Sequence, residues 1–193
     1  KEWREIAERS ALFVQKNFSG KNGTWFRRWI DGKAGIDALA EDYAYFFWGI
    51  MELYKAAKFF NPDSEKQLND WLNLAQELAD TMTAKFFDEK YGGLFENTGE
   101  DKNIFARFKS GIDFNSLPSP NALAAMALSE LAQNLEEKKY SDYAKKIIDC
   151  FSRDANNNPL SYLSLIEASL QWKPVKKKTV PPPEPEPKIL TDE

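Results

Sequence analysis

Three carboxylates have the side chains and the places in the chain that acid/base chemistry would need. Glu41 and Asp42 open an apolar segment over residues 39–60, and Asp113 lies in a long connection over residues 87–118. Glycoside hydrolysis uses two such carboxyl groups, one on either side of the scissile bond. Sequence spacing does not give their separation, so retaining and inverting chemistry both stay open. The competing and favoured interpretation is that acids in the first turn of a helix cap its free N–H groups and favour its dipole.

Aromatic side chains lie near these acids in the sequence. Trp25, Trp29, Tyr43 and Tyr45 are candidate rings for stacking against a sugar, because aromatic faces offer a large apolar contact with a polar atom at the edge. Trp25 and Trp29 fall on the same face of a predicted strand, since side chains alternate along it. As ordinary core residues, these rings would need only one satisfied polar atom each. For Trp48, in the same apolar segment, we favour the core interpretation.

A further set of residues could recognise polar groups on a ligand. Arg107, together with Arg27 and Arg28, could hold a uronate or phosphate group bidentately. Ion pairs with the 30 acidic residues of the chain are the favoured use of these arginines. Asn115 and Asn121 could bind hydroxyl groups, although turn and helix-cap chemistry would explain both residues adequately.

Residue types that are missing exclude several chemistries. The chain has no histidine, which removes Ser-His and Cys-His catalysis and HExxH metal sites. Its single cysteine, Cys150, lies in an amphipathic stretch and is interpreted as a half-buried thiol. We expect neither a metal nor a cofactor. With 26 basic and 30 acidic residues the net charge is −4, so composition gives no reason to expect nucleic-acid or anionic-membrane binding.

The chain shows no targeting or membrane signal. No apolar run reaches membrane-spanning length, and the N-terminus does not resemble a signal peptide. The sequence begins at Lys1, already within a helical pattern. We therefore predict a cytoplasmic location and interpret the chain as a fragment of a longer protein.

Six helical segments are predicted, and they alternate in character. Apolar residues follow one stripe in the first, third and fifth segments, near residues 3–18, 64–86 and 140–151. They spread around the helix in the other three, near residues 39–60, 119–134 and 158–170. Alternating one-faced and buried helices are what αα-hairpins stacked around a common axis require. The predicted fold class is therefore all-α, an α/α toroid in the form of a partial ring.

Two long connections between these helices hold turn and strand signals. Residues 19–38 contain Asp31 and Gly32 between an aromatic run and a short apolar run, which predicts a small β-hairpin. Residues 87–118 contain Gly92 and Gly93 and predict a second, looser hairpin. Both connections lead into the N-termini of buried helices, so they should lie at the same end of the molecule. Long loops in compact domains are often functional, and we place any site at that end.

Composition changes after residue 172. Three lysines at residues 176–178 precede a proline-rich run at residues 181–187. Such a segment forms an extended spacer that cannot join a packed core. We therefore divide the chain into a helical domain, residues 1–172, and a tail or linker, residues 173–193. An SH3-type ligand is the alternative for the proline run.

Three segments together resemble a known family. They are residues 39–54, which include Glu41-Asp42-Tyr43-Ala44, residues 86–95, which include Gly92-Gly93-Leu94-Phe95, and residues 118–122, which begin Pro118-Ser119-Pro120-Asn121. In these segments the chain is similar to the thioredoxin-domain-containing proteins of bacteria, archaea and animals, which include spermatogenesis-associated members. The resemblance implies a six-hairpin, glycosidase-like toroid similar to that of N-acylglucosamine 2-epimerases, with residues 1–172 as its later part. It also implies an upstream thioredoxin-like domain as a partner within the parent chain.

Two positions depart from the pattern of that family. Glu41 stands where the family usually has Asp, and Pro120 stands where it usually has Gly. A proline stiffens the loop and removes an N–H, which puts in doubt an anion- or hydroxyl-binding role for that amide. The epimerase relatives depend on histidines, so their chemistry is not carried over. The thioredoxin active site lies outside this chain, and its redox role is not carried over either.

Two functions follow as hypotheses. The first is a carbohydrate-binding or carbohydrate-active toroid whose cavity is lined by Glu41, Asp42, Asp113 and nearby rings, with a saccharide as ligand. The second is a non-catalytic interaction or structural module that accompanies the thioredoxin-like domain. A half ring would leave apolar faces of the buried helices uncovered. We therefore also predict a homodimer, or a tail that folds over the open edge.

Overall fold

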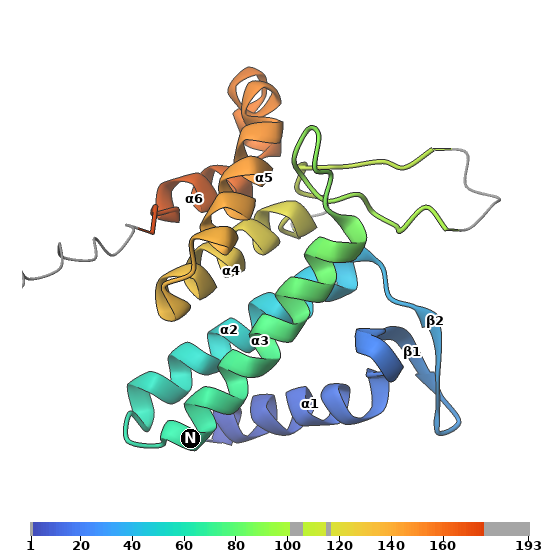
Figure 1. Cartoon of the computed structure of the whole chain (residues 1–193), viewed down its shortest axis with the longest axis vertical. Coiled ribbons are helices and arrows are strands. Elements are labelled where there is room, and N and C mark those ends of the chain that lie inside the picture. The colour runs from blue at the N-terminus through green and yellow to red at the C-terminus, as the bar shows by residue number, and fades with distance from the viewer. Residues whose placement is uncertain (1, 101–105, 115–116, 176–193) are drawn as a thin grey trace, which may run out of the picture.

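The computed structural model describes residues 2–100, 106–114 and 117–175. Within these ranges it contains six α-helices and one antiparallel two-stranded sheet, which confirms the mostly helical fold (Figure 1). No helix in the same ranges combines the length and apolar character needed to cross a membrane. The elements are α1 (Glu2–Phe18), η1 (Lys21–Gly23), β1 (Phe26–Ile30), β2 (Lys33–Asp37), α2 (Ala40–Phe60), α3 (Glu65–Phe86), α4 (Pro120–Leu135), α5 (Lys138–Asn157), η2 (Pro159–Ser161) and α6 (Leu163–Gln171).

Helices α2 and α4 form the centre of the molecule. They pack against each other, α3 and α1 pack on α2, and α5 and α6 pack on α4 (Figure 1). Eleven of the sixteen residues of α4 and eight residues of α2 are buried, whereas α1 buries only Ala11. The predicted contrast between one-faced and buried helices therefore holds between α1 and α4, but α2 buries no more residues than α3, which also buries eight. The closure of these helix pairs into a toroid stays a prediction.

The sixth helix differs from its prediction as a buried helix. In α6, Leu163 and Leu170 are 58% and 80% exposed, and only Ser164, Leu165 and Ala168 are buried. The helix has nine residues and packs on α4 and α5, so the rest of its surface has no described neighbour. Its apolar residues on that side therefore face outward.

Two other expectations of burial were wrong. Trp48 on α2, for which the core was favoured, is 36% exposed, because α1, α3 and α4 leave one strip of α2 uncovered. Trp3 and Ile6 begin the apolar stripe of α1 but are exposed as well. Only the later part of that stripe, at Val14 and Phe18, packs against the core.

A side-chain cap is present at the start of α4 and absent at the start of α3. Ser119 caps α4, because its Oγ accepts a hydrogen bond from the N–H of Ala122 at 3.0 Å, and Pro120 follows at the first helical position. Ser64, which precedes α3 and has Gln67 three residues after it in the pattern of a capping box, makes no side-chain cap bond. Gln67 instead donates from Nε2 to Glu8 Oε1 on α1, 3.0 Å away.

The first long connection folds into the predicted hairpin. Asp31 and Gly32 have φ values of 50° and 76°, and a tight two-residue hairpin turn favours such left-handed values at both positions. Strand pairing joins Phe26 to Asp37 and Arg28 to Gly35. Between these pairs Ile36 has φ 61°, which interrupts the regular ladder beside the arginine at position 27.

The second long connection lies at the same end of the molecule as the hairpin, as predicted (Figure 1). The N–H of Ala40, at the start of α2, donates to Glu96 O at 3.1 Å, and the N–H of Glu96 donates to Phe108 O at 2.9 Å. Phe87 and Leu94 form an isolated bridge, and no strand occurs in the described parts of this connection. Residues 101–105, which belong to the predicted second hairpin, lie outside the described residues.

The chain is still attached to the helices beyond residue 172. Lys173 O accepts hydrogen bonds from Gln133 Nε2 at 2.9 Å and Ser141 Oγ at 3.1 Å. Trp172 Nε1 donates to Ser141 O at 3.0 Å. The proline-rich run of the predicted tail, at residues 181–187, lies outside the described residues.

Candidate functional site

One arginine of the hairpin holds both acids at the start of α2. Arg27 Nη2 lies 2.7 Å from Glu41 Oε1, and Arg27 Nε lies 3.5 Å from Asp42 Oδ2. Asp42 Oδ2 also accepts the N–H of Leu39 at 2.8 Å. Arg27 therefore makes the ion pairs that the sequence favours for it, and Asp42 satisfies a free N–H at the beginning of its helix as first-turn acids do.

The pKa of Asp42 is raised above the usual aspartate value. Partial burial is the main cause, because it disfavours the charged form. The hydrogen bond from Leu39 and the charge of Arg27 act in the opposite direction, and the neighbouring Glu41 adds to the rise. A carboxyl group with a raised pKa is suited to hold a proton, but one oxygen of this carboxyl group is already bound to the backbone.

Asp113 joins the N-termini of two helices. Its Oδ1 accepts the N–H of Ser119 at 2.9 Å, and its Oδ2 accepts the N–H of Ser164 at 2.9 Å. The hydroxyl of Ser164 donates to Oδ1 as well. Both carboxylate oxygens are therefore used to position α4 and α6, and Asp113 lines neither of the two cavities described below.

Asn121 and Arg107 hold the second long connection in place. The buried Asn121 accepts the N–H of Leu94 at 2.6 Å and donates to Leu94 O at 3.1 Å and Ser110 O at 2.9 Å. Arg107 donates to Asn97 O at 2.9 Å, and its guanidinium lies 4.0 Å from the centre of the Phe95 ring. Asn115, the third polar residue predicted here, lies outside the described residues.

The structure places three of the four predicted rings, Trp25, Tyr43 and Tyr45, along one cavity and sets Trp29 apart from them. Trp29 packs edge-on against Phe13 of α1, with ring centres 6.4 Å apart, and lines neither cavity. The Tyr43 hydroxyl accepts a hydrogen bond from the backbone N–H of Trp25 at 3.2 Å, so these two residues join the hairpin to α2. The Tyr45 hydroxyl donates to Pro118 O at 2.8 Å. Burial raises the pKa of the Tyr43 and Tyr45 hydroxyls.

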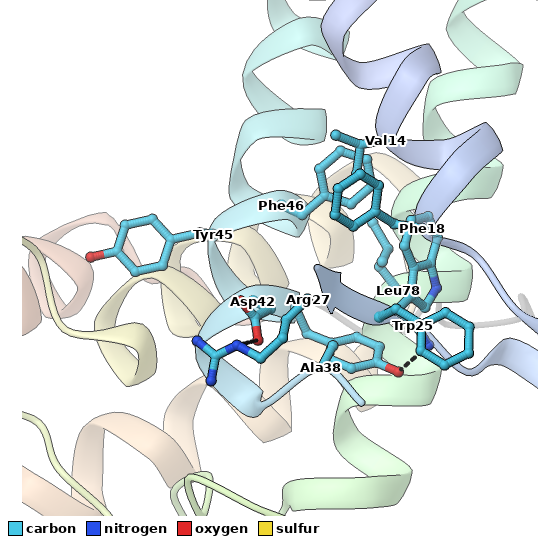
Figure 2. Close-up of a pocket in the computed structure, with 11 residues that line it drawn as sticks. Val14, Phe18, Trp25, Arg27, Ala38, Asp42, Tyr45, Phe46 and Leu78 are labelled. Atoms are coloured by element: carbon cyan, nitrogen blue, oxygen red, sulfur yellow. Dashed lines mark hydrogen bonds and ion pairs between the residues drawn. The ribbon is translucent and has the colours of Figure 1, made fainter. Parts of the chain in front are cut away.

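An aromatic cavity of about 360 Å³ lies among α1, the hairpin, α2 and α3 (Figure 2). It brings together four of the predicted site residues, while Arg27 contributes a polar edge. Tyr45 extends away from the other rings in Figure 2, so it contributes at the margin. The rings that line the cavity are Phe18, Trp25, Phe26, Tyr43, Tyr45 and Phe46, and Asp42 lines it with Arg27.

A second cavity, which we call the loop cavity, lies between the second long connection and the N-terminal ends of α2 and α4. It has a volume of about 530 Å³ and is lined by Glu41, Glu96 and Asn121 together with apolar residues that include Ile112 and Phe114. Glu41 is paired with Arg27, whereas Glu96 makes no ion pair within the described ranges. Two acidic residues, one at the start of α2 and one in the second connection, therefore line one cavity. The same ranges contain no group of three or more Cys, Asp or Glu residues that could hold a metal ion.

Glu96 was not predicted as a site residue. It follows Gly92, Gly93, Leu94 and Phe95, which the sequence marks as a turn before a short extended segment. Side chains alternate along an extended chain, so those of Leu94 and Glu96, two positions apart, lie on the same face. The position of Glu96 two residues after the apolar Leu94 is therefore the sequence signal that could have identified this acid as part of an inward face.

These features define a mostly helical protein built from packed helix pairs, with the aromatic cavity and the loop cavity at the end that carries its long connections. No family model matches the chain. It is similar to Spermatogenesis-associated protein 20 of Mus musculus, with 28% identity over 127 residues. This match covers 65% of the chain and 15% of the mouse protein, so the chain spans a small part of that relative.

Proposed function

We propose that this chain binds a saccharide in the loop cavity. The observation that carries the proposal is that Glu41, in the first turn of α2, and Glu96, in the second long connection, line one cavity. Carboxylates accept strong hydrogen bonds from hydroxyl groups, and Phe114 offers an exposed ring beside them. A volume of about 530 Å³ lies within the usual range for small-molecule sites.

The proposal is for binding rather than turnover. Of the three acids predicted for catalysis, Asp113 has both oxygens bound to backbone N–H groups, and Asp42 is bound to Leu39 and Arg27. Glu41 is the one that lines the loop cavity. Its partner there is Glu96, and both acids serve in the proposal as acceptors for sugar hydroxyls.

Titration with sugars tests this function. Thermal shift of the chain would be measured against monosaccharides and disaccharides, including uronates and amino sugars. We expect a saturable rise for one class, and binding about tenfold weaker or worse in Glu41→Gln and Glu96→Gln, since a hydrogen bond to a charged group is worth about 1.5–3 kcal/mol. Glu77→Gln, on the exposed side of α3, is the matched control and should bind like the wild type. Unchanged binding by Glu96→Gln, or no shift with any sugar, would overturn the proposal.

A second candidate is the non-catalytic interaction module. The observation that favours it is the apolar surface at the two ends of the helix array, where Trp3, Phe59 and Phe60 are exposed at one end and Leu163 and Leu170 at the other. Exposed apolar residues that gather in patches mark surfaces that meet other proteins or domains. Light scattering of the chain alone and with an added thioredoxin-like domain would test it. A chain that binds sugar and neither self-associates nor binds that domain would contradict this candidate.

A further inference from the structure

Trp25, which lines the aromatic cavity, carries a hydrogen-bond donor without a partner among the described residues. Trp25 is only 4% exposed, and its indole Nε1 is buried and meets no acceptor among the described residues. Leaving a buried N–H unpaired is costly, and such groups in native proteins call for a physical explanation. The backbone N–H of the same residue is satisfied by Tyr43, so the indole nitrogen is the group that needs an acceptor.

The walls of this cavity favour an apolar, flat occupant. Rings from three elements line it, including Phe18 of α1, Phe26 of β1 and Phe46 of α2 (Figure 2). The Trp25 and Phe46 rings lie 5.2 Å apart at 52° to each other. Apolar cavities stay dry and take up aromatic molecules, and aromatic rings pack favourably in offset or edge-on arrangements.

The charges at the edge of the cavity disfavour a charged ligand. Arg27 is the cation in the lining, and it already pairs with both Glu41 and Asp42. One positive charge against two negative charges leaves no surplus to hold an anion. An ammonium group would have to leave water for a wall that is mostly rings, which costs free energy unless it is fully paired.

We propose that the aromatic cavity binds a small neutral molecule that carries an aromatic ring and a carbonyl-type acceptor, with the acceptor on the Nε1–H of Trp25. The ring occupies the space among Phe18, Phe26 and Phe46, and the ligand oxygen completes the hydrogen bonding of the indole. This site is separate from the loop cavity and does not depend on saccharide binding there.

The indole resonances of the chain give a direct test. The sequence has six tryptophans, so a ¹H–¹⁵N spectrum contains few indole peaks, and Trp25→Phe identifies the peak of Trp25 by its loss. Acetophenone is the probe, and ethylbenzene is its matched control because it has nearly the same shape without the oxygen. Trp71 Nε1 is also buried and unpaired but lies outside this cavity, so its peak is an internal control.

We expect acetophenone to move the Trp25 indole proton downfield in a saturable way, with the Trp71 peak unchanged. Ethylbenzene should bind at least tenfold more weakly and should not cause the downfield shift. Equal binding of the two probes, or equal shifts at Trp25 and Trp71, would overturn the proposed hydrogen bond. Absence of binding by acetophenone at its solubility limit would overturn the site itself.

A second variant tests the site by filling the aromatic cavity with a larger side chain. Val14 lines the cavity from α1, and Val14→Phe should occupy the space and abolish acetophenone binding. Leu12 lies on the same helix but outside the cavity, so the Leu12→Phe variant should bind acetophenone like the wild type. Circular dichroism melts of both variants separate loss of binding from loss of folding. Binding retained in a folded Val14→Phe protein would place the ligand elsewhere and contradict the proposal.

Discussion

Asp88 and Lys109 form an ion pair that closes the base of the second long connection. Asp88 Oδ2 lies 2.7 Å from Lys109 Nζ, and their side chains are only 11% and 16% exposed. Lys109 Nζ also donates to Gly92 O at 2.8 Å, and Asp88 Oδ1 accepts the N–H of Lys90 at 2.9 Å. The turn that leads to Glu96 is therefore fixed by this pair, and the shape of the loop cavity depends on it.

Asp88→Asn is expected to destabilise the chain in a pH-dependent way. The hydrogen bond from Lys109 is the main cause of the lowered pKa of Asp88. A lowered folded-state pKa stabilises the fold above the ordinary aspartate pKa and ceases to do so as pH falls through the folded value. The wild type should exceed Asp88→Asn by about 1.5–3 kcal/mol at pH 7, and the difference should shrink under strongly acidic conditions. Urea unfolding at several pH values measures it, and a difference independent of pH would contradict the ion-pair account.

Asp113→Ala should reduce the stability of the fold. The substitution leaves the N–H of Ser164 without its acceptor and leaves the N–H of Ser119 with only the Ser164 hydroxyl, 3.2 Å away, and we expect a loss of about 2–3 kcal/mol in the free energy of unfolding. Asp149→Ala removes an exposed carboxylate paired with Lys145 on α5 and should cost about 0–1 kcal/mol. Urea titration of both variants decides between a structural and a catalytic role for Asp113, because a purely catalytic residue could be replaced without loss of stability.

Features that depend on adjacent residues could be predicted from the sequence. The turn at Asp31 and Gly32 and the cap at Ser119 are set by local backbone chemistry, so a few letters of sequence suffice. Asp113 and Asn121 have partners 51 and 27 residues away. Their types and positions were recognised, but the sequence could not show that backbone groups of distant elements would take up their polar atoms.

Hydrophobic periodicity predicts that a helix face is apolar, but it does not say what covers that face. Trp48 and Leu163 were both assigned to buried surfaces, and both are exposed. Glu96 shows the opposite case, because its place in a cavity results from the approach of the second connection to the start of α2, where the N–H of Ala40 donates to Glu96 O. Such tertiary approaches carry no local pattern in the chain.

Asn121→Asp should test the clamp on the second connection. The side-chain amide of Asn121 faces two carbonyl oxygens, Leu94 O and Ser110 O, and a carboxylate would place negative charge against them in a buried place. We expect a loss of about 2–4 kcal/mol in stability at pH 7. The introduced aspartate should have a raised folded-state pKa, so the loss should diminish as pH falls and the group takes up a proton. Urea unfolding at pH 7 and pH 4 checks this, and an equal loss at both values would count against it.

Ile36→Gly should relieve backbone strain in the hairpin. Ile36 has φ 61°, whereas Ile30 has no positive φ, and the two side chains are similarly exposed, at 56% and 52%. A β-branched residue in the left-handed region costs about 1–3 kcal/mol, and glycine avoids that cost. Ile36→Gly should therefore be as stable as the wild type or more so, while Ile30→Gly should lose about 1 kcal/mol. Thermal melts compare the two, and a larger loss in Ile36→Gly would contradict the strain account.

The exposed side of α6 bears on the predicted homodimer or covering tail. Leu163 and Leu170 are exposed there, and burying two such side chains against a second copy or the tail is favourable by about 1.5–3 kcal/mol each. Light scattering should find a dimer, and the double variant Leu163→Glu with Leu170→Glu should be monomeric. If the chain is instead monomeric, deletion of residues 176–193 should lower its melting temperature. A monomer whose melting temperature is unaffected by that deletion would contradict both forms of the prediction, because neither a copy nor the tail would then cover this surface.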